Sequence, residues 1–348
     1  MLCAALCFGL VVPFTLVVLG SGRVGIVDYA LLTSKFVGLA IGLGATAFMI
    51  FAGTEVISTG LRSRWRSRPA TALQYALKAR WDEDRLFSLA WPIVLFMLLL
   101  PAFNAYKQLI LSDASFRFDP MLAAADRAVF GTDPGLLLHQ WIGSTATTHF
   151  FDAIYHGWFV PTTLGICIVS MIASTRTRAQ FMLAYTSVWL LMGALGAWLM
   201  PAAGPGFYAA VVGPDGAEGF ERVTAALALA GQTEFVTSLS NQRYLLANHA
   251  NGVLVVGGGI SAMPSIHNAL AVLFALVSFR FHRGLGAAMT LFAALIWIGS
   301  VYLNWHYMLD GLIGGAGAAA IWFGSGKVVA ALLEWPGARC SQLTTKAL

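Results

Sequence analysis

Two histidines and an aspartate stand out in this sequence because their types and spacing suit chemistry at phosphorus. His306 precedes Asp310 by four residues, which on a helix places the two side chains on one face. A carboxylate that fixes the tautomer of an imidazole makes that imidazole a good nucleophile and stabilises the cation that forms on it. A second imidazole, that of His267, could protonate a leaving alkoxide and then deprotonate an acceptor near neutral pH. Together these groups supply what phosphoryl transfer needs.

The residues before His267 are typical of a phosphate-binding helix end. The stretch Ala262-Met-Pro-Ser-Ile-His-Asn268 lies where an outer loop is expected to become a helix. Pro264 suits a first helical turn, where unpaired N–H groups and the positive end of the helix dipole attract anions. Two other interpretations stay open on the residues alone. The histidines could cap helices at a wet interface, or His267, His306 and Asp310 could form a zinc site.

The composition excludes a soluble protein. Of the 348 residues, 58% are apolar and only 11% are charged, and the mean hydropathy is +0.74. A soluble domain carries about 25% charged residues, so this chain cannot cover a water-facing surface. Disorder and a disulfide scaffold are excluded on the same grounds. We therefore expect an all-α, polytopic integral membrane bundle, in which the four cysteines form no pair at metal spacing.

Apolar stretches long enough to build such a bundle recur along the chain. A membrane-spanning helix needs about 20 mostly apolar residues. Eight stretches qualify: 2–20, 31–58, 86–106, 152–174, 181–202, 264–281, 285–304 and 308–332. The first lacks a basic n-region and a good cleavage site, so we expect it to be retained rather than removed as a signal peptide. Two long segments lie between spans, 107–151 and 203–263, and the first is predicted to hold a short amphipathic interfacial helix followed by a turn.

The distribution of basic residues predicts the orientation of the bundle. Fourteen of the 21 basic residues lie in the 61–85 loop, in two short turns and in the tail from Lys327, and alternating spans place all of them on one face. The positive-inside rule makes that face cytoplasmic. Both termini are then expected to be cytoplasmic, with His267, His306 and Asp310 on the periplasmic or exterior face.

The spans divide the chain into three expected parts. Residues 1–85 hold two N-terminal transmembrane helices and the basic cytoplasmic loop, 86–332 form a six-helix catalytic core, and 333–348 are a cytoplasmic tail. The basic loop is expected to act as a topology signal that rests on anionic lipid.

The two histidine motifs resemble those of a known family. Met263-Pro-Ser-Ile-His267 followed by His306-Tyr-Met-Leu-Asp310 is similar to the paired Pro-Ser-x-His and His-x3-Asp motifs of the type-2 phosphatidic acid phosphatase superfamily. The likeness covers roughly residues 86–332, which would match the six-helix core of that superfamily. The resemblance implies that His306 is the nucleophile that becomes phosphohistidine, Asp310 its orienter and His267 the general acid and base, with no metal or other cofactor.

Departures from the phosphatase pattern favour another branch of that superfamily. Ile266 replaces the glycine of Pro-Ser-Gly-His, Ser300 stands where an arginine usually precedes the nucleophile, and no Lys-x6-Arg-Pro motif occurs. The sequence resembles more closely the branch that includes inositol phosphorylceramide synthase and its bacterial relatives. Members of that branch move a phosphorylated head group between lipids, so the resemblance implies a membrane lipid phosphotransferase.

Without the usual arginine, another cation must bind the phosphate. Lys107 ends the third span at a suitable depth and is the first candidate, and Arg243 in the second outer segment is the next. For each, a solvated or headgroup-contacting charge is the alternative.

Four more residues are candidates for the substrate pocket: Ser265, Tyr307, His249 and His156. For the two histidines in this group, a plain hydrogen-bonded structural role is an equal alternative.

These features predict a lipid phosphotransferase that works through a phosphohistidine on the outer face. Its partners would be a membrane lipid donor and a lipid hydroxyl or water as acceptor. Nothing points to nucleic acid, and the oligomeric state is not indicated. Two alternatives stay open: a lipid phosphate or diphosphate phosphatase, which needs only water in the acceptor site, and a lipid or ion transporter that uses the same polar cluster.

Overall fold

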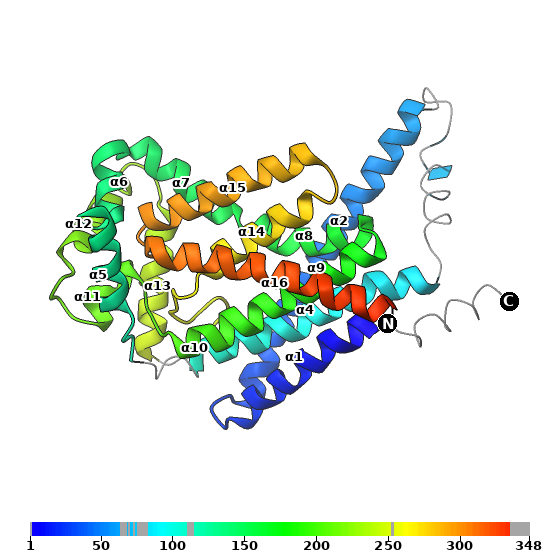
Figure 1. The fold of residues 1–348 in the computed structure, drawn as a ribbon, viewed down its shortest axis with the longest axis horizontal. Coiled ribbons are helices and arrows are strands. Elements are labelled where there is room, and N and C mark those ends of the chain that lie inside the picture. Colours follow the sequence, from blue (N-terminus) through cyan, green and yellow to red (C-terminus); the bar gives the residue numbers. More distant parts are fainter. Residues whose placement is uncertain are drawn as a thin grey trace.

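A computed structural model shows a bundle of helices (Figure 1). It describes residues 2–62, 68, 70–71, 74, 83–109, 115–251 and 254–334, and these contain no strand. Seven helical runs in the described residues are long and apolar enough to cross a membrane: Leu2–Gly20, Ile26–Leu61, Ala90–Leu109, Thr145–Ile172, Thr175–Leu199, Arg283–Tyr302 and Met308–Glu334. They confirm the predicted polytopic helical membrane bundle.

The predicted span 264–281 corresponds to a shorter helix at the centre of the bundle. α14 runs over Ile266–Ser278 and has 13 residues, which is about 20 Å of helix against a hydrocarbon core of about 30 Å. Residues 254–265 before it are not helical. α14 packs against α15 (Arg283–Tyr302) and α16 (Met308–Glu334), and nine of its residues are buried (Figure 1).

Two of the long runs are composite. Their parts are α7 (Thr145–Gly157) with α8 (Phe159–Ile172), and α9 (Thr175–Ser187) with the π-helical segment Val188–Gly196 and α10 (Ala197–Leu199). Serine caps begin three of the helices. Ser144, Ser174 and Ser265 precede α7, α9 and α14, and each hydroxyl accepts from the backbone N–H three residues on.

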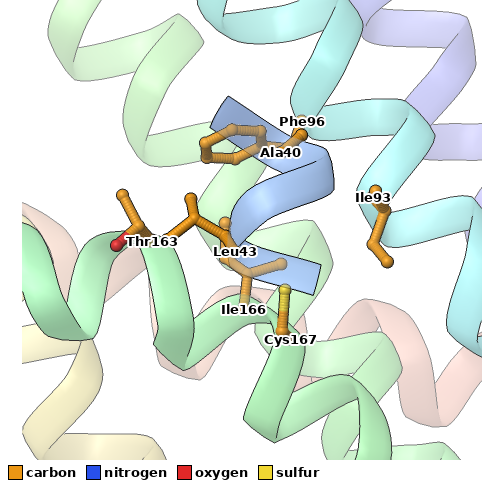
Figure 2. A pocket seen from close by; sticks show the side chains of 7 residues that line it. All are labelled: Ala40, Leu43, Ile93, Phe96, Thr163, Ile166 and Cys167. Atoms are coloured by element: carbon orange, nitrogen blue, oxygen red, sulfur yellow. The ribbon is translucent and has the colours of Figure 1, made fainter. Parts of the chain in front are cut away.

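The two N-terminal helices lie at the side of the bundle. α1 (Leu2–Gly20) and α2 (Ile26–Arg62) both pack against α4 (Glu83–Leu109), and α2 also contacts α8. Figure 2 shows where α2, α4 and α8 meet, around a crevice of about 10 Å³ lined by Ala40, Leu43, Ile93, Phe96, Thr163, Ile166 and Cys167. Thr163 carries the one hydroxyl in this lining, so apolar packing attaches α2 to the bundle there.

Short helices cover one end of the bundle (Figure 1). They are α5 (Asp119–Phe130), α6 (Pro134–Ile142), α11 (Tyr208–Val211), α12 (Glu218–Ala230) and α13 (Thr237–Asn251), with a 3-10 turn at Pro205–Phe207. The expected short helix in 107–151 is α5, which ends at Gly131 with φ of 75°, as the glycine cap of a helix does. α6 and the helices of 203–263 were not predicted.

The first and last described helices place both ends of the described chain at the same end of the bundle. The start of α1 and the end of α16 lie at one end, opposite to the short helices (Figure 1). Of the predicted basic loop 61–85, all but residues 61–62, 68, 70–71, 74 and 83–85 lie outside the described residues, and so does the predicted tail after residue 334.

Candidate active site

His306 and Asp310 are joined across the start of α16. Nδ1 of His306 lies 3.2 Å from Oδ2 of Asp310, and the backbone N–H of Tyr307 donates to the same oxygen over 3.3 Å. The histidine is not on the helix, as the four-residue spacing predicted, but in the turn before it. The pair forms because Asp310, in the first turn of α16, reaches back to the ring. This contact assigns the N–H to Nδ1 and makes Nε2 the nitrogen available for chemistry.

The turn that carries His306 is held by hydrogen bonds to its neighbours. Asn304 has a φ of 64°, in the left-handed region that asparagine adopts more readily than most residues. Its Nδ2 donates to a carbonyl of α12 over 2.9 Å and to a hydroxyl of α12 over 3.0 Å. The N–H groups of Trp305 and His306 donate to the carbonyl of Ser300 over 2.8 and 3.2 Å. α15 therefore ends here, and the chain reverses into α16.

The second histidine lies on the neighbouring helix and close to the first. His267 is in the first turn of α14, and its ring centroid lies 5.7 Å from that of His306. The ring stacks on Tyr155 with the centroids 4.8 Å apart. Trp158 lies 4.2 Å from the His267 ring and donates from Nε1 to the His267 carbonyl over 3.0 Å. These aromatic contacts fix the orientation of the His267 ring.

Both histidines line a cavity of about 340 Å³. The other residues that line it are Lys107, Tyr155, His156, Phe159, Ala203, Phe207, Asn241, Tyr244, Leu245, Val256, Gly257, Gly259, Ile260, Ser261 and Trp305. Among these described lining residues, Lys107 is the one Lys or Arg, and there is no Asp or Glu. The cavity therefore suits an anionic group, and its volume leaves room for more than a phosphate.

Lys107 is held in the cavity wall by the last turn of α4. Asn104 and Gln108, one on each side of it, bind the 255–257 backbone: Oδ1 of Asn104 accepts an N–H over 2.7 Å and Oε1 of Gln108 another over 2.8 Å. Gly259, with φ of 87°, passes so close to Lys107 that an added Cβ would lie 3.0 Å from its backbone. Glycine is needed at that approach.

His156 lies in the same cavity with its ring fixed from both sides. Its Nδ1 lies 2.8 Å from the carbonyl of Asp152 and 3.4 Å from Oδ1 of that residue, and its Nε2 lies 3.1 Å from Nδ2 of Asn241. The Asp152 carboxylate also accepts the N–H groups of Thr237 and Ser238 over 2.8 and 2.9 Å. Asp152 thus caps α13 from another helix and fixes the ring of His156.

A comparison with known families gives a match over more than half of the chain. Residues 120–324 match the model of the PAP2 superfamily. The chain belongs to this superfamily. No curated protein matches the chain, and no solved structure does.

PAP2 membership confirms the family resemblance and implies phosphatase or phosphotransferase activity. The matched residues include His267, His306 and Asp310, whereas Lys107 precedes them. The likeness to the inositol phosphorylceramide synthase branch stays a prediction.

Two of the predicted pocket residues of this PAP2 protein are buried behind the cavity wall. Ser265 is 0% exposed, and its Oγ accepts from the backbone and side-chain nitrogens of Asn268 over 3.3 and 2.9 Å. Tyr307 is 1% exposed, and its hydroxyl donates to Oδ1 of Asp119 over 2.8 Å. Neither is among the lining residues of the cavity.

Two further candidates lie away from the cavity. Arg243 is exposed on α13, and His249 lies near the end of that helix with its ring 5.8 Å from that of Phe116. Neither lines the cavity. Of the two predicted phosphate-binding cations, the structure places Lys107 beside the histidines and Arg243 elsewhere.

Several residues of the site were missed from the sequence. Tyr155 and Trp305, whose rings stack with centroids 5.9 Å apart, line the cavity, and so does Asn241. Asp119 and Asp126 were not among the predicted site residues either. Their spacing of seven residues in a chain with few charges could have indicated two acidic side chains on one face of a helix. The described residues contain no group of three or more His, Cys, Asp and Glu side chains that could hold a metal ion.

Proposed function

We propose that this PAP2 protein is a membrane lipid phosphotransferase that moves a phosphoryl or phospho-headgroup through a phosphohistidine on His306. The observation that carries the proposal is one cavity lined by His306, His267 and Lys107. In it, Asp310 binds Nδ1 of His306 over 3.2 Å, and the His267 ring is centred 5.7 Å from that of His306.

The first half-reaction would form the phosphohistidine. Nε2 of His306 bonds to phosphorus while the bond from phosphorus to the leaving oxygen breaks, and that oxygen takes a proton from the imidazolium of His267. Asp310 stabilises the positive charge that develops on the His306 ring. The lipid alcohol then leaves.

The second half-reaction would regenerate the enzyme. The acceptor hydroxyl gives its proton to His267 and bonds to phosphorus, the phosphorus–nitrogen bond breaks, and the electron pair returns to Nε2 of His306. His267 ends protonated, as it began, so the cycle balances with these groups.

Lys107 is proposed to bind the phosphoryl oxygens during both steps. An ammonium group beside a developing oxyanion in a partly enclosed site stabilises the charge far more than it would in water. In this role Lys107 replaces the arginine that the phosphatase pattern has at the position of Ser300. It lies in the same cavity lining as His306.

The rim of the cavity supports entry of the substrate from the bilayer. Phe159, Tyr244 and Val256 line the cavity and are 55%, 44% and 40% exposed. Phe159 begins α8, within a run long and apolar enough to cross a membrane. An apolar rim beside such a helix suits a lipid whose chains stay in the bilayer while its head group enters the cavity.

The positions of basic residues support a site on the periplasmic or exterior side. Arg176 and Arg178 lie where α8 meets α9, and Arg280 and Arg283 where α14 meets α15, and both junctions are at the end opposite to the short helices (Figure 1). Basic junctions favour the cytoplasm. We therefore place the termini inside and the cavity outside.

A panel of labelled lipids tests the reaction. Purified full-length protein in detergent is incubated with phospholipids carrying ³²P in the head group, with and without diacylglycerol or ceramide. We expect a new labelled lipid only when the acceptor is present, and none with His306→Ala. Release of inorganic phosphate whether or not acceptor is present would instead make the protein a phosphatase. If no lipid is turned over, and the protein reconstituted in vesicles moves a lipid or an ion across the membrane without inhibition by vanadate, the protein is a transporter.

A further inference from the structure

Two carboxylates of α5 bind the segment that connects His306 to Asp310. Asp119 and Asp126 are seven residues apart, about two helical turns, so they project from one face of α5. They are 0% and 1% exposed. Neither lines the cavity, and neither forms an ion pair with a basic residue in the described part of the chain.

Asp126 caps α16 from a different helix. Its Oδ2 accepts the N–H of Met308 over 2.7 Å and its Oδ1 accepts the N–H of Leu309 over 3.2 Å. These are the first two residues of α16, whose N–H groups have no partner within the helix. One carboxylate, from 182 residues earlier in the chain, therefore fixes the start of the helix that carries Asp310.

Asp119 binds the residue next to the nucleophile. Its Oδ1 accepts the Tyr307 hydroxyl over 2.8 Å. The same carboxylate accepts the N–H groups of Ala203 and Gly204 over 2.7 and 2.8 Å, and Ala203 lines the cavity. Asp119 thus links the motif to the cavity wall.

Buried carboxylates are costly unless their hydrogen bonds are satisfied. Here the donors to Asp126 all lie between His306 and Asp310, and one donor to Asp119 lies there too. The three residues 307–309 are the whole of the connection between nucleophile and orienter. A shift of this segment would therefore change the contact between Nδ1 of His306 and Oδ2 of Asp310, which is 3.2 Å long.

We infer that Asp126 and Asp119 are positioning residues of the reaction, which act through residues 307–309 to hold His306 and Asp310 in register. This role rests on the proposed function, because it requires that His306 reacts. Asp126 contributes most, because both of its oxygens bind the motif backbone. Tyr307 belongs to the same device as the side chain through which Asp119 acts.

The test compares Asp126→Asn with Asp133→Asn. Asparagine keeps the shape of residue 126 but points an amide N–H₂ at one of two backbone donors. Asp133 is a matched control, because it is also a buried acid at this end of the bundle, yet it binds Arg127, and no hydrogen bond or ion pair among the described residues joins it to residues 303–310. Rapid quenching with ³²P-labelled phosphatidic acid gives the rate and the amplitude of phosphoenzyme formation. ¹⁵N-histidine labelling gives the resonance of the His306 Nδ1–H proton.

We expect Asp126→Asn to lower the rate of phosphoenzyme formation about 10- to 100-fold at an unchanged amplitude, as a misplaced catalytic group does. The His306 resonance should move. Asp133→Asn removes a charge near Asp126 but none of the hydrogen bonds that Asp126 accepts, so it should leave the resonance in place and the rate and amplitude within about twofold of the wild type. Tyr307→Phe should give a smaller loss of rate in the same direction. An unchanged rate, or a lower amplitude at the wild-type rate, would overturn the inference, because the second result is that of a merely structural residue.

The two proposals fail separately. If the wild type forms no phosphoenzyme with phosphatidic acid or with any donor of the lipid panel, the proposed function fails, and the resonance then decides only whether the two carboxylates position His306 against Asp310. A resonance that moves in Asp126→Asn and not in Asp133→Asn supports the role, and one that stays in place in both overturns it.

Discussion

α5 and α2 contribute to this protein in opposite ways. α5 has 12 residues, and two carboxylates on it bind backbone and hydroxyl groups around the nucleophile. α2 has 37 residues, and where it meets α4 and α8 its contacts are apolar (Figure 2). Hydrogen bonds to a carboxylate are directional, whereas apolar packing tolerates changes of shape. The short-helix end thus sets the geometry of the site, while α2 packs beside the bundle and contributes none of its described residues to the cavity lining.

The largest effect is expected where the α5 network ends, at the reacting group. His306→Ala should lower activity by more than about 10³-fold, because the nucleophile is lost. Asp310→Asn should lower it by a similar order, because an amide neither fixes the Nδ1–H tautomer of the ring nor stabilises the positive charge that develops on it. Turnover of the lipid donor by purified, monodisperse variants measures this. Wild-type turnover by a well-folded His306→Ala variant would contradict the mechanism.

The next effect separates the two predicted cations. Lys107→Gln should lower kcat/KM about 100-fold, because the phosphoryl oxygens lose their charged partner, and Lys107→Arg should restore part of it. Arg243→Gln is the matched control, an exposed cation outside the cavity, and should change kcat/KM less than about twofold. Equal losses of kcat/KM in Lys107→Gln and Arg243→Gln would mean that Lys107 has no special role in binding the phosphoryl group.

A smaller effect concerns the stability of the α5 network. Burial raises the pKa of Asp126 to about 6, and the nearby charges of Asp310 and Asp133 add to the rise, although the Met308 and Leu309 N–H groups oppose it. The folded protein therefore binds a proton that the unfolded chain has released, and its stability should fall as pH rises through 6. Between pH 5 and 7 the free energy of unfolding of the wild type should fall by about 1.4 kcal/mol more than that of Asp126→Asn. Thermal unfolding of both proteins in detergent at the two pH values measures this change. A stability difference between the wild type and Asp126→Asn that is the same at both pH values would contradict the role of burial.

The smallest effect is expected at α2. Leu43→Ala at the crevice of Figure 2 should leave turnover within about twofold of the wild type and lower stability by no more than about 1 kcal/mol, because Leu43 is only partly buried. Leu270→Ala on α14, which is 0% exposed, should cost about 2–5 kcal/mol in comparison. A large loss of activity in Leu43→Ala would show that α2 takes part in shaping the site.

The sequence predicted the parts of the molecule that depend on local pattern. Apolar length gave the bundle, and the spacing of His306 and Asp310 indicated a pair that the structure forms, although His306 lies before α16 rather than on it. Caps supplied by residues distant in sequence were harder to predict. The short helix α13 is capped by Asp152, 85 residues away, and the long helix α16 by Asp126. Hydropathy likewise does not show which cation faces the cavity: Lys107, in the last turn of α4, lines it, whereas Arg243 on α13 does not.

The most direct test of the account is to trap the covalent intermediate. The protein is incubated with the ³²P-labelled donor that the lipid panel identifies, quenched, and digested for mass spectrometry under conditions that preserve phosphohistidine. We predict an acid-labile phosphate on Nε2 of His306, absent from His306→Ala. In His267→Ala the second half-reaction should slow as well as the first, so any intermediate that forms should break down more slowly. Turnover of the donor with no phosphate on His306, or with the label on another residue, would contradict the central claim.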